Sequence, residues 1–178
     1  MSVLRRDMPF YKNGGGITLS GGEPMMQADF VLELARVAKG EGISVMIETS
    51  GFGKKSDFER IAPFCDAFLF DCKASAPRHL ELVGVSDDVI LDNLGYLDSV
   101  GARIIIRAPI VPGANLDSEF VEKLRSLKRK YASVEKIELL PYHKIGLSKN
   151  KRLGLCDQTE FAVPTPELID QIYAELEK

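Results

Sequence analysis

The chain has 178 residues, of which 45% are hydrophobic, and this is enough for one domain with a substantial core over residues 1–178. Its 23 Lys and Arg against 26 Asp and Glu give a net charge of −3, so charge provides no case for binding nucleic acid or an anionic membrane. The sequence contains no apolar run of about 18 residues and begins with no long apolar signal region, so we expect a cytoplasmic protein without a membrane partner.

The three cysteines indicate reduced thiols. They are Cys65, Cys72 and Cys156, separated by 7 and 84 positions. An odd and sparse count favours a reducing compartment. The separations match no zinc or iron–sulfur ligand spacing.

Short apolar strands alternate with amphipathic helices along the chain. The expected strands begin near residues 17, 43, 67, 103 and 137, which gives βα units of about 24 to 36 residues, the size that a crossover helix requires. Between them we expect helices from Asp29 to Gly40, from Ser56 to Ile61, from Asp87 or Asp88 to Gly101, and from Asp117 to Tyr131. Residues 77 onward form one further turn, residues 144–163 form a loop, and 165–176 form a final helix.

Two helix starts carry specific expectations. Asp29 is expected to cap a helix, and Ser56 with Glu59 is expected to form a capping box. The apolar stripe of the first helix is expected to face inward; it consists of Phe30, Val31, Leu34, Val37 and Ala38.

The strands are apolar and β-branched on both faces, which is typical of a parallel sheet covered by helices. Two α/β architectures fit this pattern, a doubly wound open sheet and part of a (β/α) barrel. No GxGxxG stands between a strand and a helix, and this disfavours a dinucleotide-binding fold.

The expected strands end in polar groups. Gly21 and Gly22 follow the first strand and allow a ligand to approach the main chain closely, and Glu23 adds an acceptor that suits an ammonium group. Since the carboxyl ends of parallel strands point to one mouth, we expect a shared cleft for a zwitterionic nucleoside. The polar residues after the other four strands are Glu48, Thr49, Asp71, Lys73, Arg107 and His143.

Each of these residues has a simpler interpretation. A single one can be a solvated rim residue, and Asp71 with Lys73 can be a structural ion pair. Polar groups at all five strand ends favour a ligand site over chance.

The chain contains several short motifs, in this order: MPFY at 8–11, GGGITLSGGEP at 14–24, ETSG at 48–51, DCK at 71–73, VPG at 111–113 and ELLPYH at 138–143. Together they resemble the glycyl-radical-enzyme activating enzymes of the radical S-adenosylmethionine (SAM) superfamily, above all those of the pyruvate formate-lyase type. The resemblance implies a partial (β/α)₆ barrel and a [4Fe–4S] cluster that cleaves SAM to a 5′-deoxyadenosyl radical. It also implies a glycyl radical enzyme as partner and a flavodoxin or ferredoxin as electron donor.

The resemblance also implies roles for the candidate residues. The turn of Gly21, Gly22 and Glu23 would contact the SAM amino group. Asp71 and Lys73 would contact the ribose and carboxylate region, and His143 would lie on the nucleoside. Glu48 and Thr49 would lie near the methionyl end, with Arg107 a weaker candidate for the same site.

The family's cluster motif, CxxxCxxC, is absent from the 178 residues. By comparison with the family, the first βα unit is expected to be missing, which leaves five of the six strands. We therefore expect this chain by itself to hold no cluster and to be inactive. Three interpretations stay open: a fragment or wrongly started form of an activating enzyme, a cluster-free module that binds SAM or a protein, and an inactive remnant.

Loss of that unit would expose the edge of the strand at 17–19, which carries no Lys, Pro or bulge. We therefore expect self-association through 17–20, unless residues 4–13 fold back over the gap.

Overall fold

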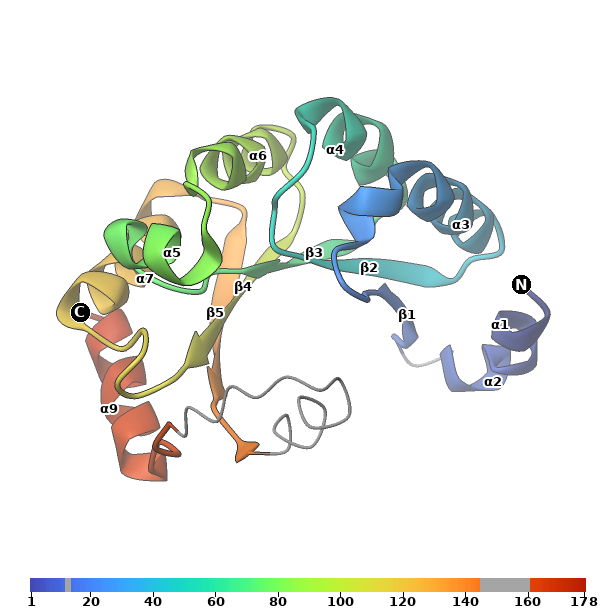
Figure 1. The fold of residues 1–178 in the computed structure, drawn as a ribbon. Coiled ribbons are helices and arrows are strands. Elements are labelled where there is room, and N and C mark those ends of the chain that lie inside the picture. The colour runs from blue at the N-terminus through green and yellow to red at the C-terminus, as the bar shows by residue number, and fades with distance from the viewer. Residues whose placement is uncertain (12–13, 145–160) are drawn as a thin grey trace, which may run out of the picture.

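Five parallel strands form one sheet whose strand order is the same as the chain order, β1-β2-β3-β4-β5 (Figure 1). The structure is a computed structural model that describes residues 1–11, 14–144 and 161–178. This arrangement confirms the expected parallel α/β sheet with five strands. The strands are β1 (Gly16–Leu19), β2 (Ser44–Thr49), β3 (Ala67–Asp71), β4 (Ile104–Ile110) and β5 (Val134–Pro141).

The helices cover the outer face of the curved sheet, as Figure 1 shows for α3, α4, α6, α7 and α9. Short 3₁₀ turns, η1 (Pro24–Gln27) and η2 (Ala62–Phe64), adjoin α3 and α4. No helix in the described ranges is long and apolar enough to cross a membrane. The main helices are α3 (Ala28–Gly40), α4 (Lys55–Ile61), α5 (Ala76–Val83), α6 (Asp88–Ser99), α7 (Ser118–Lys130) and α9 (Pro166–Leu176).

The core lies between the sheet and these helices. It contains fully buried aromatic and aliphatic side chains such as Phe58, Phe68, Leu94, Ile106 and Phe120. Each large apolar side chain buried in this way contributes about 1.5–3 kcal/mol by removing apolar surface from water. This core holds the strands in register, and the register in turn fixes which residues emerge at the carboxyl ends of the strands.

The N-terminal residues pack beside β1 as two short helices, α1 (Ser2–Arg6) and α2 (Met8–Tyr11). Met1, Leu4 and Tyr11 contact a cluster centred on Ala35, Ala38, Ile43 and Val45. Arg5 binds Glu41 with its Nη2 2.6 Å from Oε1. The N-terminal segment therefore folds back toward β1, but among the described residues β1 pairs with β2 alone.

Several local expectations are wrong. Asp29 lies in the first turn of α3 and does not cap it, because the chain is already helical in η1. Helix α4 begins at Lys55, before Ser56, and its N-cap residue makes no side-chain hydrogen bond, so no capping box forms. Helix α5 is eight residues long where a single turn was expected.

The inward face of α3 also differs from the expectation. Val31, Ala35 and Ala38 are buried, whereas Phe30 is 66% exposed and Val37 is 36% exposed. The small alanines allow the helix to lie close to the sheet, which leaves the larger Phe30 outside. The expected stripe therefore includes two residues that the fold leaves in solvent.

Candidate functional site

A polar cavity of about 210 Å³ lies at the carboxyl ends of β1, β2 and β3. The sequence analysis predicted nine site residues, and seven of them line it: Gly21, Gly22, Glu23, Glu48, Thr49, Asp71 and Lys73. Ser20 and Ser50 complete the lining.

The parallel register brings these residues together. Leu19 pairs with Ile47, and Thr49 pairs with Phe70, so the three strands end at nearly the same level. The residues that follow each strand therefore emerge around one opening, as the rule for parallel α/β sheets predicts.

The Gly21–Gly22 turn exposes its main chain to open space. Gly21 has φ +152°, a conformation that side-chain-bearing residues rarely adopt. A Cβ atom added at either glycine would meet nothing within 4 Å. The peptide groups of this turn are therefore accessible to a ligand at close range.

Glu23 is bound by four donors of its own chain. Its Oε1 accepts from Met25 N at 3.1 Å and Thr49 Oγ1 at 2.6 Å, and its Oε2 accepts from Ser50 N at 2.8 Å and Ser50 Oγ at 2.5 Å. The carboxylate thus ties the end of β1 to the end of β2 and uses about all of its four acceptor positions. The acceptors of the turn that stay available to an ammonium group are main-chain carbonyls.

Ser50 is a site residue that the sequence analysis quoted in a motif without giving it a role. Its two hydrogen bonds to Glu23 depend on the spatial meeting of two turns that lie 27 positions apart. The available signal was its place directly after Thr49, at the end of a strand.

Asp71 and Lys73 both line the cavity, and they form an ion pair in which Asp71 Oδ2 lies 3.7 Å from Lys73 Nζ. Burial raises the pKa of the Asp71 carboxyl, while the Lys73 ammonium opposes the rise and the Glu48 carboxylate adds to it. The cavity thus combines three carboxylates with one ammonium group. This arrangement suits a ligand that carries both a cation and a carboxylate.

Arg107 and His143 are not among the residues that line this cavity. Arg107 forms an ion pair with Glu48, and its buried Nε lies 3.9 Å from Glu138 Oε2 and has no hydrogen-bond partner among the residues that the structure describes. Arg107 therefore binds the Glu48 carboxylate without itself lining the cavity. His143 is exposed, two residues beyond β5.

Two buried asparagines that the sequence analysis missed support the connections around the cavity. Asn115 donates from Nδ2 to the carbonyls of Lys73 at 2.7 Å and Pro109 at 2.6 Å, and its Oδ1 accepts from Val111 N. Asn93 donates to the carbonyls of Gly51 and Gly53 after β2. The only available signal was a polar residue at an otherwise apolar position of an expected helix or turn.

The described cysteines do not fit an iron–sulfur cluster, which requires thiolate ligands. Burial raises the pKa of Cys65 to about 12 and that of Cys72 to about 11, so both stay protonated near neutral pH. Cys156 lies outside the described residues. Within the described ranges, no group of three or more His, Cys, Asp or Glu side chains could hold a metal ion.

The fold and this cavity define a class of protein that comparison with known sequences identifies. The model of the radical SAM superfamily matches residues 6–127, and the chain belongs to that superfamily. Its curated relatives are activating enzymes for glycyl radical enzymes.

Three of these relatives show the extent of the similarity. The trans-4-hydroxy-L-proline dehydratase activating enzyme of Clostridioides difficile is 37% identical and is matched over 95% of this chain and 58% of its own length. The choline trimethylamine-lyase activating enzyme of Oleidesulfovibrio alaskensis is 41% identical over 86% of this chain and 51% of its own. The pyruvate formate-lyase 1-activating enzyme of Escherichia coli is 37% identical over 80% and 59%. The chain thus spans between half and three fifths of the length of these relatives.

Solved structures agree on the fold. A domain of a pyruvate-formate lyase-activating enzyme from Bacteroides vulgatus has a TM-score of 0.76 at 23% identity, covering 92% of this chain and 94% of that domain. SuiB of Streptococcus suis, solved with S-adenosylmethionine bound, has a TM-score of 0.68 at 20% identity, covering 98% of this chain and 38% of its own.

Proposed function

We propose that this chain is the SAM-binding part of an activating enzyme whose protein substrate is a glycyl radical enzyme. The observation that carries the proposal is the cavity at the carboxyl ends of β1, β2 and β3, where an accessible Gly21–Gly22 main chain faces Asp71 and Lys73. The curated relatives support it, because three different glycyl-radical activating enzymes match at 37–41% identity.

The residues of the cavity suit the parts of SAM. The main chain of Gly21 and Gly22 would accept from the ammonium group, and Glu23 would keep that turn in place. Asp71 would accept from the ribose hydroxyls and Lys73 would bind the carboxylate. These contacts use the charges and acceptors that the cavity offers.

Four further residues complete the proposed site. Glu48 and Thr49 would lie near the methionyl end, with Arg107 holding Glu48, and His143 would lie on the nucleoside. In the activating enzymes that the chain resembles, SAM and a [4Fe–4S] cluster would together supply the radical that removes a hydrogen atom from a glycine of the partner enzyme. The described residues suit SAM and not the cluster, so their proposed part is to bind and orient SAM.

The proposal also includes a particular partner enzyme, an electron donor and a cellular location. The proposed partner is a pyruvate formate-lyase-like enzyme, which the similarity to the Escherichia coli relative supports. The proposed electron donor, a flavodoxin or ferredoxin, and the proposed cytoplasmic location rest on the family resemblance.

Calorimetry with SAM and S-adenosylhomocysteine tests the proposal. We expect weak binding by the wild-type chain and at least about tenfold weaker binding by Lys73→Ala and Asp71→Ala, because each loses a charge-assisted contact. Lys128→Ala and Asp92→Ala, on exposed faces of α7 and α6, serve as controls and should bind like the wild type. No binding at millimolar ligand, or binding that neither cavity variant changes, would contradict the assignment.

A cluster-free module that binds SAM or a protein partner is a second candidate, favoured by the buried, protonated thiols of Cys65 and Cys72. Anaerobic reconstitution of the 178-residue chain with iron and sulfide is the measurement that can exclude this module. We expect no [4Fe–4S] absorption and no 5′-deoxyadenosine on reduction. About four irons per chain, together with SAM cleavage, would exclude the module.

A further inference from the structure

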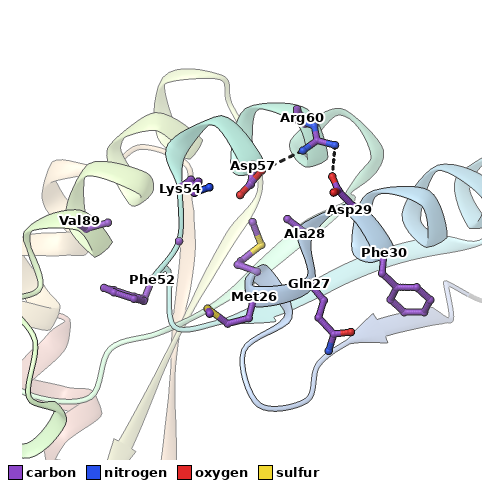
Figure 2. A pocket seen from close by; sticks show the side chains of 12 residues that line it. Met26, Gln27, Ala28, Asp29, Phe30, Phe52, Lys54, Asp57, Arg60 and Val89 are labelled. Atoms are coloured by element: carbon purple, nitrogen blue, oxygen red, sulfur yellow. Dashed lines mark hydrogen bonds and ion pairs between the residues drawn. The ribbon is translucent and has the colours of Figure 1, made fainter.

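A second hollow, distinct from the polar cavity, is an open groove of about 720 Å³ with apolar side chains along it (Figure 2). Met26 is 72% exposed, Phe30 is 66% exposed and Phe52 is 41% exposed, while Met25 is buried. Figure 2 shows Phe52 toward one end, Phe30 toward the other and Met26 between them. Large apolar side chains gathered on one surface are typical of interaction sites, and methionine adapts its shape to a partner.

The groove lies at the same end of the molecule as the cavity. It is lined by η1, by the first turns of α3 and α6, by one face of α4 and by the connection after β2. In parallel βα units, the helix that follows a strand begins at the carboxyl end of that strand. A molecule bound in the groove therefore stands beside the mouth of the cavity.

The polar cavity and the groove are connected by residues that are hydrogen-bonded to each other or adjacent in the sequence. The Glu23 carboxylate, which shapes the cavity, accepts from Met25 N, and Met25 lines the groove. Ser50, which binds the same carboxylate, is followed within two residues by Phe52. Gly53 packs so tightly that a Cβ there would lie 3.1 Å from Met25 Cβ.

The charged groups along the groove differ in whether they have partners among the described residues. Arg60 binds Asp29 at 2.6 Å and Asp57 at 3.2 Å, so these three charges satisfy one another. The side chain of Lys54 is exposed, and its ammonium group takes part in no ion pair or hydrogen bond within the described part of the chain. A partner that presents a carboxylate would complement Lys54.

We propose that this groove docks a segment of the glycyl radical enzyme that presents apolar side chains together with a carboxylate. The inference rests on the proposed function, because a protein substrate must bring a glycine to the cavity and therefore must contact the surface around its mouth. Met26, Phe30 and Phe52 provide the apolar anchors of this surface, and Lys54 provides the charge that fixes orientation.

Binding of three purified glycyl radical enzymes to the immobilised chain tests the proposal. The enzymes are pyruvate formate-lyase, choline trimethylamine-lyase and trans-4-hydroxy-L-proline dehydratase, and SAM affinity is measured in parallel. We expect at least one enzyme to bind and the double variant Met26→Ser/Phe30→Ser to weaken that binding about tenfold or more. Lys54→Glu should weaken it at low salt and less at high salt.

Controls come from the opposite end of the molecule. Val100, at the end of α6, is 51% exposed, and Lys128 is exposed near the end of α7. Val100→Ser and Lys128→Glu should bind the enzymes like the wild type. All variants should keep the SAM affinity of the wild type, since none of the changed residues lines the polar cavity.

Three results would overturn the proposal. The first is that no enzyme binds although SAM does, and the second is that the groove variants bind the enzymes like the wild type. The third is that the wild type sediments as a dimer and the double variant as a monomer, which would make a second copy the occupant. If the wild-type chain does not bind SAM, that result would instead count against the proposed function itself.

Discussion

At the scale of single residues, Glu23 has the most direct effect on the shape of the site. Its carboxylate accepts three hydrogen bonds from Thr49 and Ser50 at the end of β2 and one from Met25 in η1, so it fixes both turns that border the cavity. A ligand that binds the Gly21–Gly22 main chain depends on this arrangement without touching the Glu23 oxygens.

Glu23→Gln tests this role. The amide keeps one acceptor oxygen and places an NH₂ group against either the Met25 and Thr49 donors or the Ser50 donors, so we expect the free energy of unfolding to fall by about 1–3 kcal/mol. SAM affinity should fall as well. Denaturant unfolding and calorimetry measure the two effects.

Glu33→Gln is the matched control, because Glu33 is exposed and binds only the neighbouring Arg36 in the same helix. It should change neither quantity measurably. Equal stability of the two variants would show that the four hydrogen bonds of Glu23 contribute little.

The thiols give a prediction about pH. The folded pKa values of Cys65 and Cys72 are about 12 and about 11, above the value of about 8.5 for a thiol in an unfolded chain. Between these values the unfolded chain loses protons that the folded chain keeps, so the thiols lower stability as the pH rises above about 9. Their contribution is constant below about pH 8.

Unfolding by urea at pH 8 and pH 10 checks this, with Cys65→Ala/Cys72→Ala as the comparison. The double variant should lose less stability between the two pH values than the wild type does. In addition, alkylation of the native chain at pH 8, followed by mass spectrometry, should modify Cys72 far more slowly than in urea. Alkylation of native Cys72 at the unfolded rate would contradict its burial.

At the scale of elements, the connections after the strands are fastened by side chains from the following units. Asn115, which is 3% exposed, joins the segment after β3 to the end of β4. Asn93 in α6, which is 1% exposed, holds the segment after β2. Each asparagine positions one side of the site through the main chain.

Asn115→Asp should therefore weaken SAM binding by displacing Lys73. The aspartate loses both donations from Nδ2 and places a carboxylate against the Lys73 and Pro109 carbonyls, so we expect about tenfold weaker binding. Calorimetry at a temperature where the variant is fully folded is the measurement.

Asn93→Asp loses the same number of hydrogen bonds but acts on Gly51 and Gly53. It should destabilise the fold similarly and retain the Lys73 contribution, so Lys73→Ala added to it should still weaken binding. If Lys73→Ala still weakens binding as much in the Asn115→Asp background, Asn115 does not position Lys73.

The helix boundaries show which local features the sequence predicts. Asp117 caps α7 by accepting from Phe120 N, and Thr165 caps α9 by accepting from Leu168 N, at the residues where the sequence analysis expected these helices to begin. Asp29 and Ser56 had the same chemistry, but neighbouring helical residues had already started both helices. Cap signals depend on the conformation of the preceding residues, which a residue pattern does not contain.

The candidate site likewise contains some residues that the sequence predicted and others that it did not. Residues at strand ends were predictable because strand periodicity and parallel pairing bring them together. Ser50, Asn93 and Asn115 were not, because each has a partner between 27 and 42 positions away in the chain. The partner is the Glu23 carboxylate for Ser50 and a main-chain carbonyl for each asparagine. The expected loop at 144–163 falls mostly outside the described residues.

At the scale of the whole molecule, we consider the outer edge of β1, on the side away from β2. The N-terminal helices pack against the same apolar cluster as Ile17 and Leu19 but supply no strand, so the outer edge of β1 carries no strand partner among the described residues. An uncovered edge of this kind pairs readily with another chain.

We therefore expect self-association at tens of micromolar, measured by sedimentation velocity at several concentrations. Thr18→Lys, on the exposed face of β1, should reduce it because a lysine on an edge strand disfavours pairing. Ser126→Lys on α7 adds the same charge and should not. A wild type that is monomeric at all concentrations would show that the N-terminal helices protect the edge.

The strictly sequential strand order has a consequence for how the molecule is made. Each strand pairs with the strand that precedes it in the chain, so none has to wait for a segment synthesised much later. Every new βα unit closes a loop of only a few tens of residues, and the entropic cost of each closure stays modest. We expect the sheet to grow from β1 to β5 as the chain leaves the ribosome, with each incomplete stage presenting one open edge that the next unit covers.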